Sequence, residues 1–157
     1  MLERVSIPME ELVPVLRLQM EHGTAILPVR GISMHPMLRN GRDQVILEKP
    51  VFPLKGHPIL LYQRNDGDYI LHRLVRRTKT CFLCCGDNQW QTEPVRTEQV
   101  VATVTGFIRK GKTYYVNHRG YRIYVWLWSA VLPVRRPLLA VRRCLGKLRK
   151  IRRRKTK

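Results

Sequence analysis

Short apolar runs separated by turn-forming residues fill the middle of this 157-residue chain. The turn Asn65-Asp66-Gly67-Asp68 stands between two alternating apolar runs, which is a strong signal for a β-hairpin. Seven runs at this spacing predict a mainly β protein, with a compact and partly rolled antiparallel sheet. The predicted strands are Ala25–Arg30, Gln44–Lys49, Pro58–Gln63, Tyr69–Arg76, Thr80–Cys85, Gln99–Arg109 and Thr113–Val116.

Helical patterns flank this β-segment on both sides. Residues 10–22 have apolar side chains at helical spacing and are followed by Gly23, a common helix stop. Residues 121–132 predict an apolar helix that ends before Pro133, and residues 138–151 predict a basic amphipathic helix. We therefore divide the chain into an N-terminal helix and lead-in (1–23), a β-domain (24–118) and a helical tail (119–157).

The positive charge is concentrated in the tail. Residues 99–157 carry 17 of the 30 Lys and Arg residues and none of the 11 Asp and Glu residues. An apolar stretch with Tyr124, Trp126 and Trp128 precedes most of this charge, as in helices that lie in the headgroup region of anionic membranes. We expect peripheral or monotopic membrane association through residues 121–157. A solvated helix packed on the domain and a nucleic-acid-binding tail are the alternative interpretations, the last being the least favoured.

Neither a secretory signal nor a metal site is expected. Residues 1–14 include three glutamates and lack a continuous apolar region, and no run of about 20 apolar residues suits a spanning helix. Cys81, Cys84 and Cys85 form a cluster without the second pair that a zinc site needs. We therefore expect reduced cysteines and no metal or organic cofactor.

Three residues in the β-segment have the chemistry of a serine hydrolase. Ser33 lies in a tight turn between Gly31 and Pro36, His72 lies on an apolar strand, and Asp87 lies in a Gly-Asp-Asn turn. A serine nucleophile needs a general base, and the base in turn needs an orienting group. Taken singly, each residue also has a structural interpretation, as a turn serine, a core histidine and a turn aspartate.

Five motifs in this order resemble the signal peptidase I family. They are Gly31–Leu38 (with Gly-Ile-Ser-Met), Gly41–Val45, Leu54–Gly56, Leu71–Val75 (with His-Arg) and Gly86–Asn88. The resemblance covers about residues 25–108 and implies a serine endopeptidase that acts on extended peptide or preprotein segments, often at a membrane surface. The His72-Arg73 pair is similar to the histidine type of this family.

The resemblance assigns roles to individual residues. Ser33 is the implied nucleophile, His72 the general base and Asp87 the third member of the site, with Gly31 and Met34 at the substrate and oxyanion position. In histidine-type members a further aspartate lies just beyond Gly-Asp-Asn, where this chain offers only Glu93.

Alternatives exist within the resemblance and outside it. LexA-type repressor peptidases share the Gly-x-Ser-Met pattern, but this chain has only some 23 residues before its first predicted strand and no Ala-Gly bond for self-cleavage. Lys49, Lys55 and Lys79 are other potential bases, although none has the matching position. The competing class is a non-catalytic β-domain whose basic tail binds an anionic membrane or nucleic acid.

Overall fold

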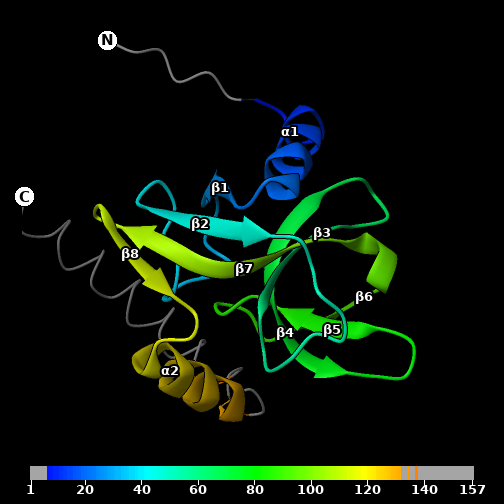
Figure 1. The fold of residues 1–157 in the computed structure, drawn as a ribbon. Coiled ribbons are helices and arrows are strands. Elements are labelled where there is room, and N and C mark those ends of the chain that lie inside the picture. Colours follow the sequence, from blue (N-terminus) through cyan, green and yellow to red (C-terminus); the bar gives the residue numbers. More distant parts are fainter. Residues whose placement is uncertain (1–6, 132–133, 135–136, 138–157) are drawn as a thin grey trace, which may run out of the picture.

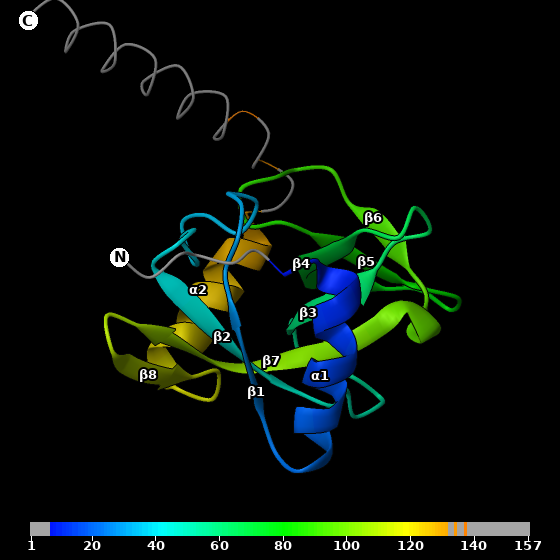
Figure 2. The same cartoon turned by 90° about the horizontal axis from the view of Figure 1, so that it is seen from above.

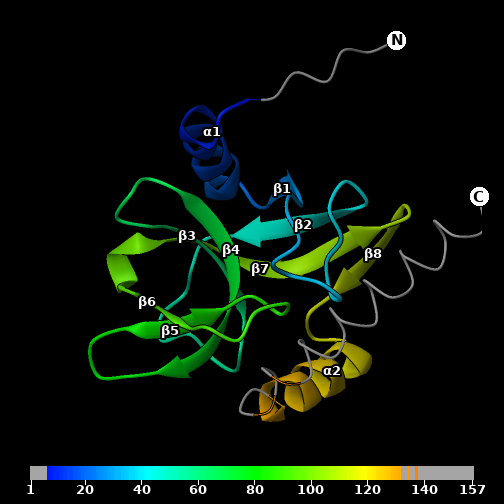
Figure 3. The same ribbon diagram turned by 180° about the vertical axis from the view of Figure 1, so that it is seen from behind.

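The predicted mainly antiparallel β-fold is confirmed in a computed structural model that describes residues 7–131, 134 and 137. An open sheet of eight strands forms the body, with helix α1 (Met9–Glu21) and helix α2 (Arg119–Ala130) on opposite sides of it (Figure 1). The view from behind shows the same separation of the two helices (Figure 3).

The strands follow the order β1-β2-β7-β3-β4-β5-β6 across the sheet, and β8 pairs with β7. All of their pairings are antiparallel. The sequence analysis did not predict β6, because it has only three residues and contains a proline. The bounds are β1 Ala25–Pro28, β2 Asp43–Glu48, β3 Ile59–Gln63, β4 Tyr69–Arg77, β5 Phe82–Cys85, β6 Glu93–Val95, β7 Val100–Arg109 and β8 Lys112–Tyr115, with a 3-10 turn at Thr97–Gln99.

Irregular pairings bend the sheet. The register shifts between Ile46 and Leu47 in β2, between Leu61 and Tyr62 in β3, and between Leu74 and Arg76 in β4. Such bulges increase the twist of a strand and curve the sheet. Residues of β1 and β4 consequently line the same groove, although three strands separate them in the sheet order.

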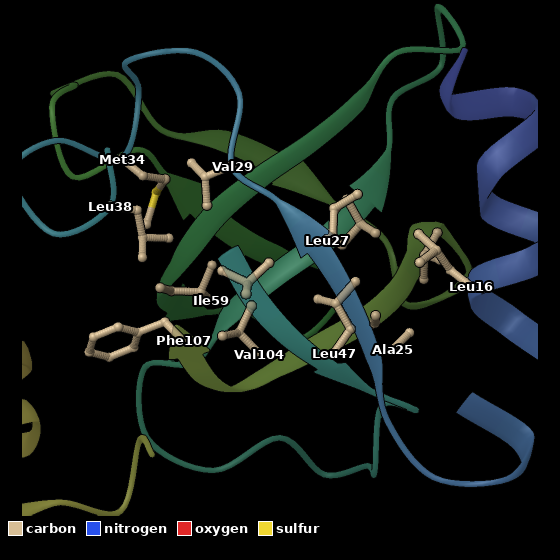
Figure 4. Packing of buried hydrophobic residues seen from close by; sticks show 14 of the residues in the cluster. Leu16, Ala25, Leu27, Val29, Met34, Leu38, Leu47, Ile59, Val104 and Phe107 are labelled. Atoms are coloured by element: carbon tan, nitrogen blue, oxygen red, sulfur yellow. The ribbon is translucent and has the colours of Figure 1, made fainter. Parts of the chain in front are cut away.

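The main hydrophobic core lies inside this curved sheet and beneath α1. Leu16 of α1 is 2% exposed, whereas its neighbour on the outer face, Leu18, is 63% exposed. Figure 2 shows α1 beside β1, with which it is in contact. Met34 and Leu38, from the loop after β1, point into the same core as Ile59 (Figure 4). The loop that carries Ser33 is therefore part of the core packing.

Helix α2 is the last element of the fold among the described residues. The helix was predicted over residues 121–132. The observed helix begins two residues earlier, at Arg119, and ends two residues earlier, at Ala130. Within the described residues, no helix is both long enough and apolar enough to cross a membrane. The predicted basic helix over 138–151 and the basic end of the chain lie outside the described residues.

Candidate active site

The loop after β1 holds Ser33 in a tight turn. Gly31 has a φ of +81°, a conformation that glycine adopts without steric cost. The amide of His35 donates to the carbonyl of Ile32 (3.2 Å), and the amide of Leu38 donates to that of Met34 (2.9 Å). Met34 is only 2% exposed, so its side chain fixes the position of the residue directly after the serine.

A buried carboxylate fixes the far end of the same loop. Asp43 is 1% exposed and accepts hydrogen bonds from the amide of Arg39 (3.0 Å) and from the side chain of Arg42 (2.6 and 2.7 Å). Burial alone would raise the pKa of Asp43, but these hydrogen bonds hold the pKa below its ordinary value. Arg109 reaches both Asp43 and the carbonyl of Met37. The loop is thus tied to β2 and β7.

His72 lies in the middle of β4, and its ring is hydrogen-bonded to a carboxylate from β6. Its Nδ1 lies 2.9 Å from Oε1 of Glu93 and 3.1 Å from the hydroxyl of Tyr62, which also donates to Glu93. Arg64 donates to both oxygens of Glu93, at 2.6 and 3.0 Å. Since the carboxylate accepts, Nδ1 carries the proton and Nε2 of the neutral ring keeps a free lone pair.

Burial and hydrogen bonds set the charge states of His72 and Glu93. Burial lowers the pKa of His72 below 6.5, and Glu93 offsets only part of this effect. Burial would raise the pKa of Glu93, but the hydrogen bonds from Arg64 and Tyr62 bring the pKa below its ordinary value. The ring is therefore neutral and the carboxylate charged at pH 7.

The Gly86-Asp87-Asn88 turn brings the serine segment and the histidine together. The amide of Asn88 donates to the carbonyl of Ser33 at 2.7 Å. A Cβ at Gly86 would lie 2.6 Å from that carbonyl oxygen and 3.1 Å from Nε2 of His72. Nε2 of His72 and the carbonyl of Ser33 thus both border Gly86, where no side chain fits. Within the described residues the Ser33 hydroxyl has no hydrogen-bond partner, a separation that is common in sites without substrate.

Asp87, expected as the third member of the site beside His72, pairs with Arg73 instead. Its carboxylate accepts two hydrogen bonds from the guanidinium of Arg73, both 2.8 Å long, and both side chains are fully buried. The carboxylate at Nδ1 of His72 belongs to Glu93 instead. The only sequence signal for Glu93 was its place beyond Gly-Asp-Asn, and nothing in the sequence indicated the roles of Arg73, Tyr62 and Arg64.

The backbone around Ser33 offers hydrogen-bond donors. In the part of the chain that the structure describes, the amides of Ser33 and Met34 have no acceptor. Amides of consecutive residues in a turn can together stabilise an oxyanion. Gly31 is exposed and lines the groove described next, whereas the side chain of Met34 is in the core, so only its backbone is available to a ligand.

A groove of about 820 Å³ runs past Ser33. It is lined by residues 27–34 of β1 and the following loop, by residues 69–71 of β4, and by Asn88 and Gln89. Met9 and Leu12 of α1 contribute further apolar surface. The lining of the groove is mostly apolar, as in most ligand-binding clefts.

We predict that Asp87 is mainly a structural residue. Asp87→Ala leaves the Arg73 guanidinium buried without its counter-charge, which lowers the free energy of unfolding by about 3–5 kcal/mol. Glu98→Ala, at an exposed position, changes it by less than about 0.5 kcal/mol. Urea unfolding followed by far-UV circular dichroism measures both variants. Equal stabilities would contradict the structural role of the pair.

The comparisons with known proteins leave the site to be judged on its own chemistry. No family model and no curated protein matches this chain. We therefore interpret Ser33, His72 and Glu93 from their own geometry.

Proposed function

We propose that this protein is a serine endopeptidase of the signal peptidase type. Ser33 is the nucleophile, His72 is the general base, and Glu93 orients His72. One observation carries the proposal: Nδ1 of His72 is held by a charged carboxylate, while Nε2 of His72 and the carbonyl of Ser33 both border Gly86. The motifs that resemble signal peptidase I support the same assignment.

The reaction follows from this arrangement. The hydroxyl of Ser33 attacks the scissile carbonyl while Nε2 of His72 takes its proton, and the imidazolium then gives the proton to the leaving amine. The carboxylate of Glu93 stabilises the imidazolium during the transfer. The amides of Ser33 and Met34 donate to the developing oxyanion. In the second step, water attacks the acyl group while Nε2 of His72 takes a proton from it, and the imidazolium returns the proton to the oxygen of Ser33 as the acyl group leaves. The proposed cycle needs neither a metal nor an organic cofactor.

The groove determines the form of the substrate. We propose an extended peptide segment, from a signal or leader peptide, that lies between residues 27–31 and residues 69–71 with its backbone paired like an added strand. The apolar walls accept alternate side chains of that segment. Small side chains fit best next to Ser33, because Ile32 and the Asn88 turn border the serine on either side.

The proposed place of action is the surface of an anionic membrane. On the outer side of α2, Ile123 is 60%, Trp126 69% and Leu127 51% exposed, which is an apolar face without a partner among the described residues. The sequence around this helix is strongly basic, so an anionic bilayer complements it in both charge and polarity. A non-catalytic protein that only binds membrane through this face is the competing proposal, and nucleic acid is the less favoured ligand of the tail.

The first experiment is covalent labelling with a fluorophosphonate. We expect a single adduct on Ser33 by mass spectrometry, lost in Ser33→Ala and nearly lost in His72→Ala, because nucleophile and base act as a unit. His22→Ala is the matched control and labels like wild type, since His22 lies at the end of α1. Labelling that is absent in wild type, or that survives in His72→Ala, contradicts the peptidase proposal.

The pH dependence of labelling tests the role of Glu93. Because burial lowers the pKa of His72 below 6.5, the labelling rate stays constant near pH 7 and falls as the pH drops through that lower pKa. Glu93→Gln removes a charge that raises the pKa, so its acid limb moves to still lower pH, and its rate at pH 7 falls by at least about a hundredfold. Glu98→Gln keeps the wild-type profile. An unchanged acid limb in Glu93→Gln would contradict the Glu93–His72 assignment.

Vesicle binding tests the proposed membrane face. Trp126→Ser weakens co-sedimentation with phosphatidylglycerol vesicles by about tenfold, because it removes one large side chain from the interface. Val15→Ser, on the exposed side of α1, provides the control for loss of a comparably exposed apolar residue. Equal binding of Trp126→Ser and wild type would rule out this face of α2 as the contact.

A further inference from the structure

One face of α2 makes polar contacts with the turn beside the candidate active site. Tyr121, Tyr124 and Trp128 follow one another at helical spacing, so they lie on the same side of the helix. The hydroxyl of Tyr124 donates to the carboxylate of Asp87 at 3.0 Å, and Nε1 of Trp128 donates to the backbone carbonyl of Asp87 at 3.1 Å. The helix therefore holds Asp87 by both its side chain and its main chain.

The same face also encloses the arginine that pairs with Asp87. The guanidinium of Arg73 donates to the hydroxyl of Tyr121 at 3.1 Å and lies over the rings of Tyr121 and Tyr124, at 5.7 and 5.9 Å from their centroids. Arg73 is fully buried in this environment. Asp87 is thus fixed from two directions, by Arg73 of β4 and by α2.

The turn that contains Asp87 touches both reacting residues. The amide of Asn88 donates to the carbonyl of Ser33. On the other side of Asp87, Gly86 lies so close to that carbonyl and to Nε2 of His72 that no side chain fits there. A displacement of Asp87 moves its two neighbours, which changes the distance between the serine and the histidine. A misplacement of about 1 Å in such a pair costs on the order of a hundredfold in rate.

We propose that Tyr124 and Trp128 are positioning residues, which act through Asp87 to hold the 86–88 turn where Ser33 and His72 can react. This inference rests on the proposed peptidase function and extends it. It makes α2 a structural part of the active site as well as the proposed membrane contact, since its inner face holds the turn and its outer face is exposed.

The test measures the inactivation kinetics of two conservative variants. Tyr124→Phe and Trp128→Phe each remove one donor to Asp87 and retain an aromatic ring. We expect the maximal rate of fluorophosphonate inactivation to fall about tenfold in each, with the half-saturating probe concentration unchanged within about twofold. Tyr115→Phe is the matched control, because Tyr115 is 56% exposed on β8 and its variant also loses an aromatic hydroxyl, and it keeps the wild-type rate.

Thermal unfolding of each variant separates positioning from stability, since a purely structural role lowers the melting temperature without slowing inactivation of the folded protein at 25 °C. Wild-type rates in both Tyr124→Phe and Trp128→Phe would overturn the inference. A rate that falls equally in Tyr115→Phe would also overturn it, because the effect would then not depend on the contacts with Asp87.

A second measurement keeps the inference separate from the proposed function. The Asn88 amide, which donates to Ser33, is followed by ¹H–¹⁵N correlation spectra. A shift of this resonance in Tyr124→Phe and Trp128→Phe, but not in Tyr115→Phe, supports positioning of the turn by α2. An unchanged resonance in all three variants overturns it. If wild type does not react with the probe, the peptidase proposal fails, and the Asn88 resonance alone decides whether α2 positions the turn.

Discussion

The buried ion pair between Arg73 and Asp87 connects most of the parts that form the site. Arg73 extends from β4 and donates from two of its nitrogens to the Asp87 carboxylate. It also donates to the carbonyl of His57, 3.1 Å away, in the segment before β3. Two unsolvated charges are stable only when they are paired and fully hydrogen-bonded. The hydroxyl of Tyr124 completes the set of donors around Asp87. The pair thus requires β4, the 86–88 turn and α2 to be in place together.

Two adjacent side chains of β4 point to opposite faces of the strand and have different roles. Side chains of consecutive strand residues point to opposite faces, so His72 and Arg73 serve different surroundings although they are adjacent. His72 contacts Glu93 of β6 and Tyr62 of β3, and Arg73 contacts Asp87 and α2. One strand therefore carries both the proposed base and the cation that holds the turn against it. This arrangement explains how a strand only nine residues long organises the site.

Glu93 is the residue on which the proposed chemistry depends most, and it stays charged because of its neighbours. Its side chain is 24% exposed, and Arg64 supplies two hydrogen bonds from the solvent side. A charged acceptor at Nδ1 orients the histidine ring and compensates the charge that the ring gains when it takes a proton. Burial of the ring has the opposite effect and keeps it neutral before the reaction. The two effects together favour a ring that is neutral at rest and stabilised when it becomes charged.

The sequence predicted the parts of the site that are encoded locally. Alternating apolar residues and strong turns placed seven of the eight strands within a few residues, and the local motifs singled out Ser33 and His72. The pairing of carboxylates could not be predicted, because it depends on which strands become neighbours. Glu93 lies 21 residues from His72 on a strand too short to detect, and Asp87 is close to Ser33 and His72 in the fold while its carboxylate pairs with Arg73. The contacts of the inner face of α2 could not be predicted either, since its aromatic residues have the pattern of an ordinary apolar helix.

The protonation state of the His72 ring is the most direct test of the proposed role of His72 as a base held by Glu93. Long-range ¹H–¹⁵N spectra of the imidazole at pH 7 distinguish the two neutral tautomers and the imidazolium. We expect a neutral ring with its proton on Nδ1, a free lone pair on Nε2, and loss of that preference in Glu93→Gln. A proton on Nε2, or a charged ring at pH 7, would contradict the assignment of His72 as a base held by Glu93.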